Sequence, residues 1–80
     1  MATYLICHRH EPAECRFAYA SWKGVDSPLR HRFTMSSCAK GGHELWWTLE
    51  ADDAPGALAQ LPAFLAERSR AIEVSEVRIP

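Results

Sequence analysis

Two histidines and a cysteine lie within one short run near the start of the chain, His-Arg-His-Glu-Pro-Ala-Glu-Cys from His8 to Cys15. If the residues before this run form a strand that ends at His10, side chains two positions apart share a face, so His8 and His10 point the same way. Pro12 suits the first turn of a helix, and Cys15 follows one turn further on. Imidazole and thiolate groups together suit Zn²⁺, Cu or Ni²⁺ and do not suit Mg²⁺ or Ca²⁺. The run therefore predicts a transition-metal site.

The hydrophobic pattern indicates which elements would position this run. Residues 3–10 alternate and are apolar on both faces at their start, which is typical of a strand covered on two sides. Residues 12–23 carry one apolar stripe at helical spacing, formed by Cys15, Ala18, Tyr19 and Trp22. Gly24 suits the position that ends such a helix.

A hairpin is predicted in the middle of the chain. Residues 32–39 are a strand candidate, and residues 43–51 show the clearest alternation of the whole sequence. Gly41 and Gly42 suit a two-residue turn between them, because primed turns need positive φ at their central positions. On residues 43–51 one face carries His43, Leu45, Trp47, Leu49 and Ala51, and the other carries Glu44, Trp46, Thr48 and Glu50.

A second helix and a last strand complete the chain. The pair Asp52-Asp53 supplies an N-cap for this helix, and Pro55 lies in its first turn. Pro62 cannot continue an unbroken helix, so we expect a kink or two short helices with Pro62 opening the second. Residues 71–79 alternate again, with Ile72 and Val74 on one face and Val77 and Ile79 on the other.

The element order is therefore β-α-β-β-α-β, which predicts a single ferredoxin-like α+β domain over residues 1–80. Its four-stranded antiparallel sheet would have the order 4-1-3-2, with both helices on one face. Leu5, Cys7 and Trp46 would then lie on a face that no element covers. Exposed apolar patches mark interfaces, so we expect a homodimer that packs the open faces of two sheets together.

This topology also brings distant metal ligands to one end of the sheet. The end of the first strand, the start of the first helix, the end of the second strand and the start of the third meet there. The ligands gathered are His8, His10, Cys15, Cys38 and His43. Four of them would complete a tetrahedral zinc site, and three would leave a position for water. Glu11 or Glu14 would accept a hydrogen bond from the ring N–H of a ligating histidine.

A metal-free interpretation of the same residues stays open. No Cys-x-x-Cys or His-Glu-x-x-His spacing is present, and a free cysteine such as Cys15 also packs as a small hydrophobic side chain. The chain would then be an enzyme or a binding protein for a small organic molecule, with His8, His10 or His43 as general acid or base. Its pocket, between helices and sheet, would be lined by Tyr19, Trp22, Trp47 and Phe64.

Two further possibilities concern surface features. The triplet Arg30-His31-Arg32 either binds an anion or a partner chain, or lies solvated in its loop. The whole chain can also be an accessory subunit without chemistry of its own, in which case the histidine cluster is incidental.

Composition excludes several classes of protein. Nine Lys and Arg against ten Asp and Glu are scattered along the 80 residues, which leaves no basic footprint for nucleic acid or an anionic membrane. Residues 43–51 also lack the basic and aromatic pattern of RNA-recognition domains. There is no apolar run of about 20 residues to span a membrane, no signal-peptide pattern, and three cysteines do not make a disulfide framework. We expect a soluble cytoplasmic protein that needs a metal or a partner subunit to stabilise so small a core.

The chain resembles the dimeric α+β barrel proteins in its element order, its size and its two-sided central strands. Within that group, the start Thr-Tyr-Leu-Ile-Cys-His-Arg-His and the finish Val-Ser-Glu-Val-Arg-Ile-Pro are similar to small nickel-binding members. The resemblance implies a homodimer and Ni²⁺ binding, but assigns no ligand. Other members of the group are cofactor-independent monooxygenases, isomerases, cyclases and haem-handling enzymes, so the fold leaves the reaction open.

Overall fold

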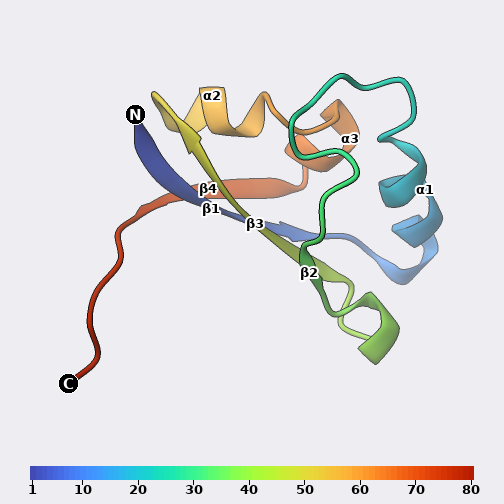
Figure 1. Cartoon of the computed structure of the whole chain (residues 1–80). Coiled ribbons are helices and arrows are strands. Elements are labelled where there is room, and N and C mark those ends of the chain that lie inside the picture. The colour runs from blue at the N-terminus through green and yellow to red at the C-terminus, as the bar shows by residue number, and fades with distance from the viewer.

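A four-stranded antiparallel sheet and three short α-helices make up the computed structural model, which describes residues 1–80 (Figure 1). The strands are β1 (Ala2–Arg9), β2 (Met35–Ser36), β3 (Glu44–Ala51) and β4 (Ser69–Val74). The helices are α1 (Cys15–Ala20), α2 (Ala54–Leu58) and α3 (Ala63–Ala66), with 3₁₀ turns η1 (Pro12–Glu14) and η2 (Cys38–Lys40). The sheet order β2-β3-β1-β4 is the predicted order 4-1-3-2, counted from the other edge.

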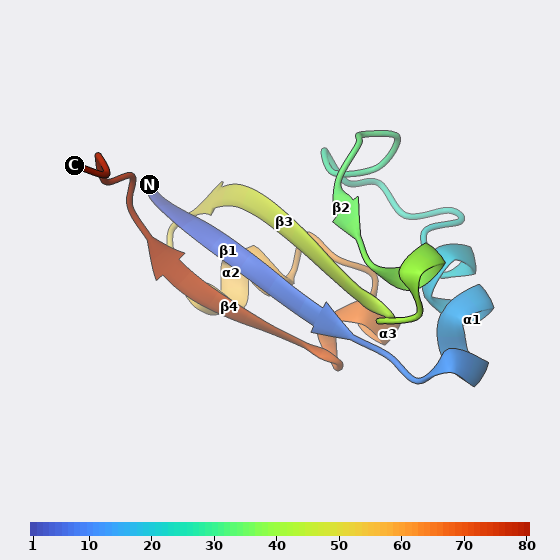
Figure 2. The same ribbon diagram turned by 90° about the horizontal axis from the view of Figure 1, so that it is seen from below.

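The core lies on one face of this sheet. β1 pairs with β3 from Ala2↔Ala51 to Arg9↔Glu44, and residues directly opposite each other share a face. The inner face carries Tyr4, Ile6, His8, Leu45, Trp47 and Leu49, all of them buried. α2 and α3 pack over this face, whereas no element covers the other, as Figure 2 shows with the strands in front of both helices.

The first helix is shorter than the predicted 12–23. Its first turn is the 3₁₀ turn η1, where the Glu11 N–H donates to the Glu14 carboxylate at 2.9 Å. α1 ends at Ala20 because the Ser21 hydroxyl donates to the Ala18 carbonyl at 2.7 Å, a local bond that competes with the helix. The chain turns away at Gly24, whose φ of 80° is the left-handed geometry expected of a helix end.

The predicted strand 32–39 is wrong except at Met35–Ser36. Serine side chains replace the strand ladder with local bonds: the Ser36 hydroxyl accepts from the Cys38 N–H, and the Ser37 hydroxyl accepts from the Glu44 N–H. The chain forms η2 instead of continuing the strand. The predicted Gly41-Gly42 turn is also wrong, because positive φ occurs at Gly41 and His43 and not at Gly42. With η1, η2 and a divided second helix, the element order is not strictly β-α-β-β-α-β.

Pro62 divides the second helix, which is one of the two predicted outcomes. It lies directly before α3. The Asp53 side chain caps α2 by accepting from the Gly56 N–H at 2.7 Å.

The last strand begins and ends earlier than the predicted 71–79. Thr3↔Val74 is the last pair with β1, so Val77 and Ile79 have no strand to join and lie exposed in the tail (Figures 1 and 2). No helix in the structure has the length and apolarity that crossing a membrane would require.

Candidate metal centre

Two imidazoles and two thiols from four separate segments meet at one end of the sheet. The residues are His10 directly after β1, Cys15 at the start of α1, Cys38 at the start of η2 and His43 directly before β3. One donor atom from each lies within 4.8 Å of every other. Four of the five ligands predicted from the sequence are therefore brought together, and the fifth, His8, lies outside this set.

Backbone hydrogen bonds near the end of the β1–β3 ladder hold the two histidines together. The His10 N–H donates to the His43 carbonyl at 3.1 Å, one position beyond the last paired residues of β1 and β3. The imidazole centroids lie 5.4 Å apart. η1 turns the chain back immediately after His10. The Cys15 N–H donates to the Pro12 carbonyl at the end of this turn, which places Cys15 beside the two histidines. Local turn chemistry, rather than the sheet alone, builds this end of the molecule.

His43 carries two signs of a ligand-binding role. Its φ of 54° lies in the left-handed region, which few non-glycine residues adopt and which costs about 1–3 kcal/mol. Its ring nitrogen Nδ1 is the one buried side-chain nitrogen or oxygen atom in the structure without a hydrogen-bond partner. Buried polar atoms are nearly always satisfied by a protein group, a water or an ion. The unpartnered ring nitrogen of His43 is therefore available to bind a metal.

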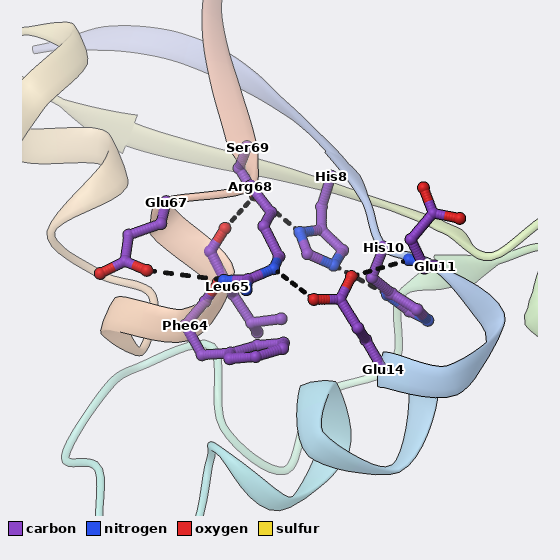
Figure 3. Close-up of polar contacts among 9 residues, drawn as sticks. All are labelled: His8, His10, Glu11, Glu14, Phe64, Leu65, Glu67, Arg68 and Ser69. Atoms are coloured by element: carbon purple, nitrogen blue, oxygen red, sulfur yellow. Dashed lines mark hydrogen bonds and ion pairs between the residues drawn. The ribbon is translucent and has the colours of Figure 1, made fainter.

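His8 orients the His10 ring through a chain of three hydrogen bonds (Figure 3). The Ser69 hydroxyl gives its only proton to the Leu65 carbonyl at 2.6 Å, so its oxygen accepts from His8 Nδ1–H at 2.9 Å. His8 Nε2 is then unprotonated and accepts from His10 Nδ1–H at 2.9 Å. This leaves His10 Nε2 unprotonated, so its lone pair accepts from the Cys38 thiol, whose Sγ lies 3.6 Å away, or binds a metal in place of that proton. The chain selects the tautomer that a metal ligand needs.

The burial of these histidines favours the neutral ring. His8 and His10 are 1% and 4% exposed. Burial lowers the pKa of His8 and the neighbouring His10 ring lowers it further; the pKa of His10 is lowered by burial and by His43. Both imidazoles therefore stay uncharged at neutral pH, which is the state that binds a metal.

The two thiols differ in acidity. Burial raises the pKa of Cys15, and the adjacent Cys38 raises it further. Burial acts in the same direction on Cys38, but hydrogen bonds from the Ser36 and Tyr19 hydroxyls and from Cys15 outweigh it and lower the pKa of Cys38. Cys38 is therefore the readier thiolate, and Cys15 the thiol whose proton a metal must displace.

Of the two glutamates predicted to orient a ligand, Glu14 has other partners. The Glu14 carboxylate accepts from the Glu11 N–H at 2.9 Å and pairs with Arg68 at 3.0 Å (Figure 3). These two donors, the Glu11 N–H first, lower the pKa of Glu14. Neither glutamate makes a hydrogen bond to an imidazole; His8 and Ser69 hold the ring of His10 instead.

Three of the four predicted pocket residues line one cavity. Tyr19, Trp22 and Trp47 face a hollow of about 290 Å³ between α1, β3 and the loop that follows α1. Phe64 lies elsewhere, with the Arg68 guanidinium 3.8 Å above its ring. The basic triplet of residues 30–32 also borders this hollow, so two features that the sequence presented separately meet at one place.

Ser69 is the residue of this site that no sequence pattern indicated. The β1–β4 register places it directly opposite His8. The alternation that predicted the last strand begins only at residue 71, because Ser69 and Arg70 break the apolar pattern. A polar pair at the end of two strands leaves no signal in hydrophobic periodicity.

Comparison of the chain with protein families, with curated protein sequences and with solved structures finds no match. What the molecule itself shows is a small α+β domain with a four-stranded antiparallel sheet and a His₂Cys₂ cluster that can bind a metal.

Proposed function

We propose that this chain is a transition-metal-binding protein that holds one ion through His10, Cys15, Cys38 and His43. The observation that supports it is the convergence of the four donor atoms within 4.8 Å. Metal–ligand bonds of 2.0–2.3 Å in a tetrahedral zinc site require donor atoms about 3.3–3.8 Å apart. The 3.6 Å between His10 Nε2 and Cys38 Sγ already meets this requirement, and the other donors need to move by about an ångström or less.

Zn²⁺ is the ion that this donor set fits best, since two imidazoles and two thiolates in tetrahedral arrangement are a common zinc ligand set. Ni²⁺ and copper bind the same donors and are the competing ions, Ni²⁺ also through the resemblance to small nickel-binding proteins. Four protein ligands leave no coordination position for a substrate water. The site therefore serves to store, carry or sense an ion, or to stabilise the fold, rather than to catalyse hydrolysis.

The test is native mass spectrometry with elemental analysis, on untagged protein loaded with Zn²⁺, Ni²⁺ or Cu⁺ under reducing conditions. We expect about one ion per chain, held most tightly for Zn²⁺ and lost in Cys15→Ser and in Cys38→Ser. Cys7→Ser is the matched control, because Cys7 is also a free thiol but lies on the opposite face of the sheet. A wild-type chain that retains none of the three ions would refute the proposal, as would loss in Cys7→Ser alone.

We also propose that two chains pair through the open face of the sheet. That face carries the half-buried apolar side chains of Leu5, Trp46, Ile72 and Val74. Arg70 lies opposite Cys7 near one end of the strands, and Glu50 lies opposite Thr3 near the other. A two-fold axis that crosses the strands would place each arginine against the glutamate of the second copy, and would bury the apolar centre.

Sedimentation velocity tests this pairing. The wild-type chain of 9.0 kDa should sediment as a dimer at micromolar concentration, and Trp46→Lys should produce a monomer with an unchanged far-UV spectrum, because a lysine placed at the centre of an apolar interface is costly to bury. Ala59→Lys adds the same charge at an exposed position after α2 and should leave the dimer intact. A monomeric wild-type chain would overturn the proposal.

A further inference from the structure

The cavity of about 290 Å³ beside α1 has an aromatic wall. Trp47 is buried on the inner face of β3, and Trp22 packs against it with ring centroids 6.0 Å apart and planes tilted by 56°. Tyr19 adds a third ring, whose hydroxyl is bonded to Ser36 at 3.1 Å. Tilted rings of this kind present both a face and an edge to a planar group that lies against them.

The rim of the same cavity is cationic through two arginines. Arg30, His31 and Arg32 all border it, and the residues that line it include no aspartate or glutamate. Both ion pairs of the structure belong to Arg68, so neither Arg30 nor Arg32 has a carboxylate partner within the chain. The Arg30 guanidinium makes one long bond of 3.4 Å, to the Val25 carbonyl, and keeps its other donors free.

The loop that carries these cations is held in place at both of its ends. The Ser27 hydroxyl donates to the Gln60 carbonyl at 2.7 Å, and the Thr34 hydroxyl donates to the Trp46 carbonyl. Between these points Leu29 is buried in the core, and His31 adopts a left-handed φ of 68°. The loop is therefore ordered around the cavity before any ligand arrives, which reduces the entropic cost of binding.

We propose that this cavity is a binding site for a small aromatic acid. Its ring would lie against Trp22 and Trp47, and its carboxylate would accept hydrogen bonds from Arg30 and Arg32, whose planar guanidinium groups match a carboxylate. The volume lies at the small end of the range for ligand pockets, roughly 300–1,000 Å³, which favours a ligand of one or two rings. The Arg30 and Trp47 side chains lie outside the His₂Cys₂ cluster, so this proposal does not require a bound metal. Tyr19 is shared by the two sites, because its hydroxyl also bonds to Cys38.

Benzoate and benzamide make the sharpest pair of probes, since they share size and shape and differ in charge. Both are titrated into ¹⁵N-labelled protein, with and without Zn²⁺. We expect benzoate to bind about five- to tenfold more tightly than benzamide, as charge-assisted bonds near the surface allow. The indole N–H signals of Trp22 and Trp47 and the backbone amides of residues 29–34 should shift.

Charge variants test whether the arginines of the basic triplet cause the preference for benzoate over benzamide. Arg30→Gln/Arg32→Gln should reduce benzoate to the affinity of benzamide and leave metal loading unchanged. Arg16→Gln/Arg78→Gln removes the same net charge at two exposed positions that do not line the cavity, and it should leave the preference intact. Equal affinity for the two probes would overturn the proposal, and so would binding that occurs only in the metal-loaded protein, because the carboxylate would then be binding the ion.

Discussion

Zn²⁺ supplied at about a hundredfold excess over its dissociation constant should raise the free energy of unfolding of this chain by about 2.7 kcal/mol. In a domain of this size 1 kcal/mol corresponds to about 4–8 °C, so the midpoint of thermal unfolding should rise by roughly 10–20 °C. The increase is large in relation to the total stability of the fold, because a chain of 80 residues without a disulfide buries only about 60% of the surface that it exposes when unfolded.

The physical reason is that the ion would join segments that little else connects. β2 has two residues, and the 3₁₀ turn that carries Cys38 is held by serine hydroxyls and by a few local backbone hydrogen bonds. Linking Cys38 to Cys15 and His10 ties this segment to α1 and to the end of β1. Binding free energy then appears as folding free energy.

Thermal unfolding followed by circular dichroism, with Zn²⁺ or with a chelator, measures the effect. Cys38→Ser should abolish the increase, whereas Cys7→Ser, with its thiol on the opposite face, should retain it. An increase of the same size in Cys15→Ser/Cys38→Ser would mean that zinc acts elsewhere on the chain.

The stabilisation by zinc should weaken as the pH falls, because the ion and protons compete for the ligands of the cluster. Since burial raises the pKa of Cys15, zinc must displace its proton near neutral pH, and the affinity should fall about tenfold per pH unit for each proton displaced.

The metal-free protein should also lose stability on acidification. Burial lowers the pKa of His8 and His10, so below about 6.5 the unfolded chain takes up protons that the folded chain does not. That loss continues until the pH falls below the folded pKa values.

Hydrophobic alternation predicted the central sheet well, because β1 and β3 bury their inner faces and so need apolar residues at every second position. The sheet order followed from the predicted element order, and the preference of helix N-termini for aspartate indicated a cap at Asp52-Asp53, which Asp53 forms. Prediction failed where polar side chains decide the backbone. Ser36 and Ser37 replace the expected second strand with a turn, and Ser69 begins the last strand two residues early.

The same division applies to the site. Topology alone predicted that His10, Cys15, Cys38 and His43 would converge, since strand ends meet at one edge of a sheet. Topology could not distinguish His8 from the four ligands, because the spacing of His8 and His10 along the strand shows only that both side chains lie on the same face. Their different roles follow from burial and from the position of Ser69, neither of which a sequence pattern shows.

Removing the His8 imidazole should weaken zinc binding by about 10–100-fold although His8 is not one of the four ligands, because partners of ligating histidines commonly have effects of this size. In His8→Phe the His10 Nδ1–H loses its acceptor, so the ring is free to rotate and to adopt the other tautomer. His8→Gln should recover part of the affinity, since its amide oxygen can accept from His10 and its amide nitrogen can donate to Ser69.

Loss of packing alone must be separated from loss of orientation. Ile6→Ala, at a fully buried neighbouring position on the same face of β1, should cost about 2–5 kcal/mol of stability and leave the zinc affinity of the folded protein within about twofold. The ¹⁵N shifts of the His10 ring give the direct readout. In the metal-free wild type they should show a protonated Nδ1 and an unprotonated Nε2, and in His8→Phe a mixture of tautomers. A protonated Nε2 in the wild type would show that the Ser69 hydroxyl donates to His8 and not to the Leu65 carbonyl. His10 would then have to rotate or lose a proton before it could bind a metal through that atom.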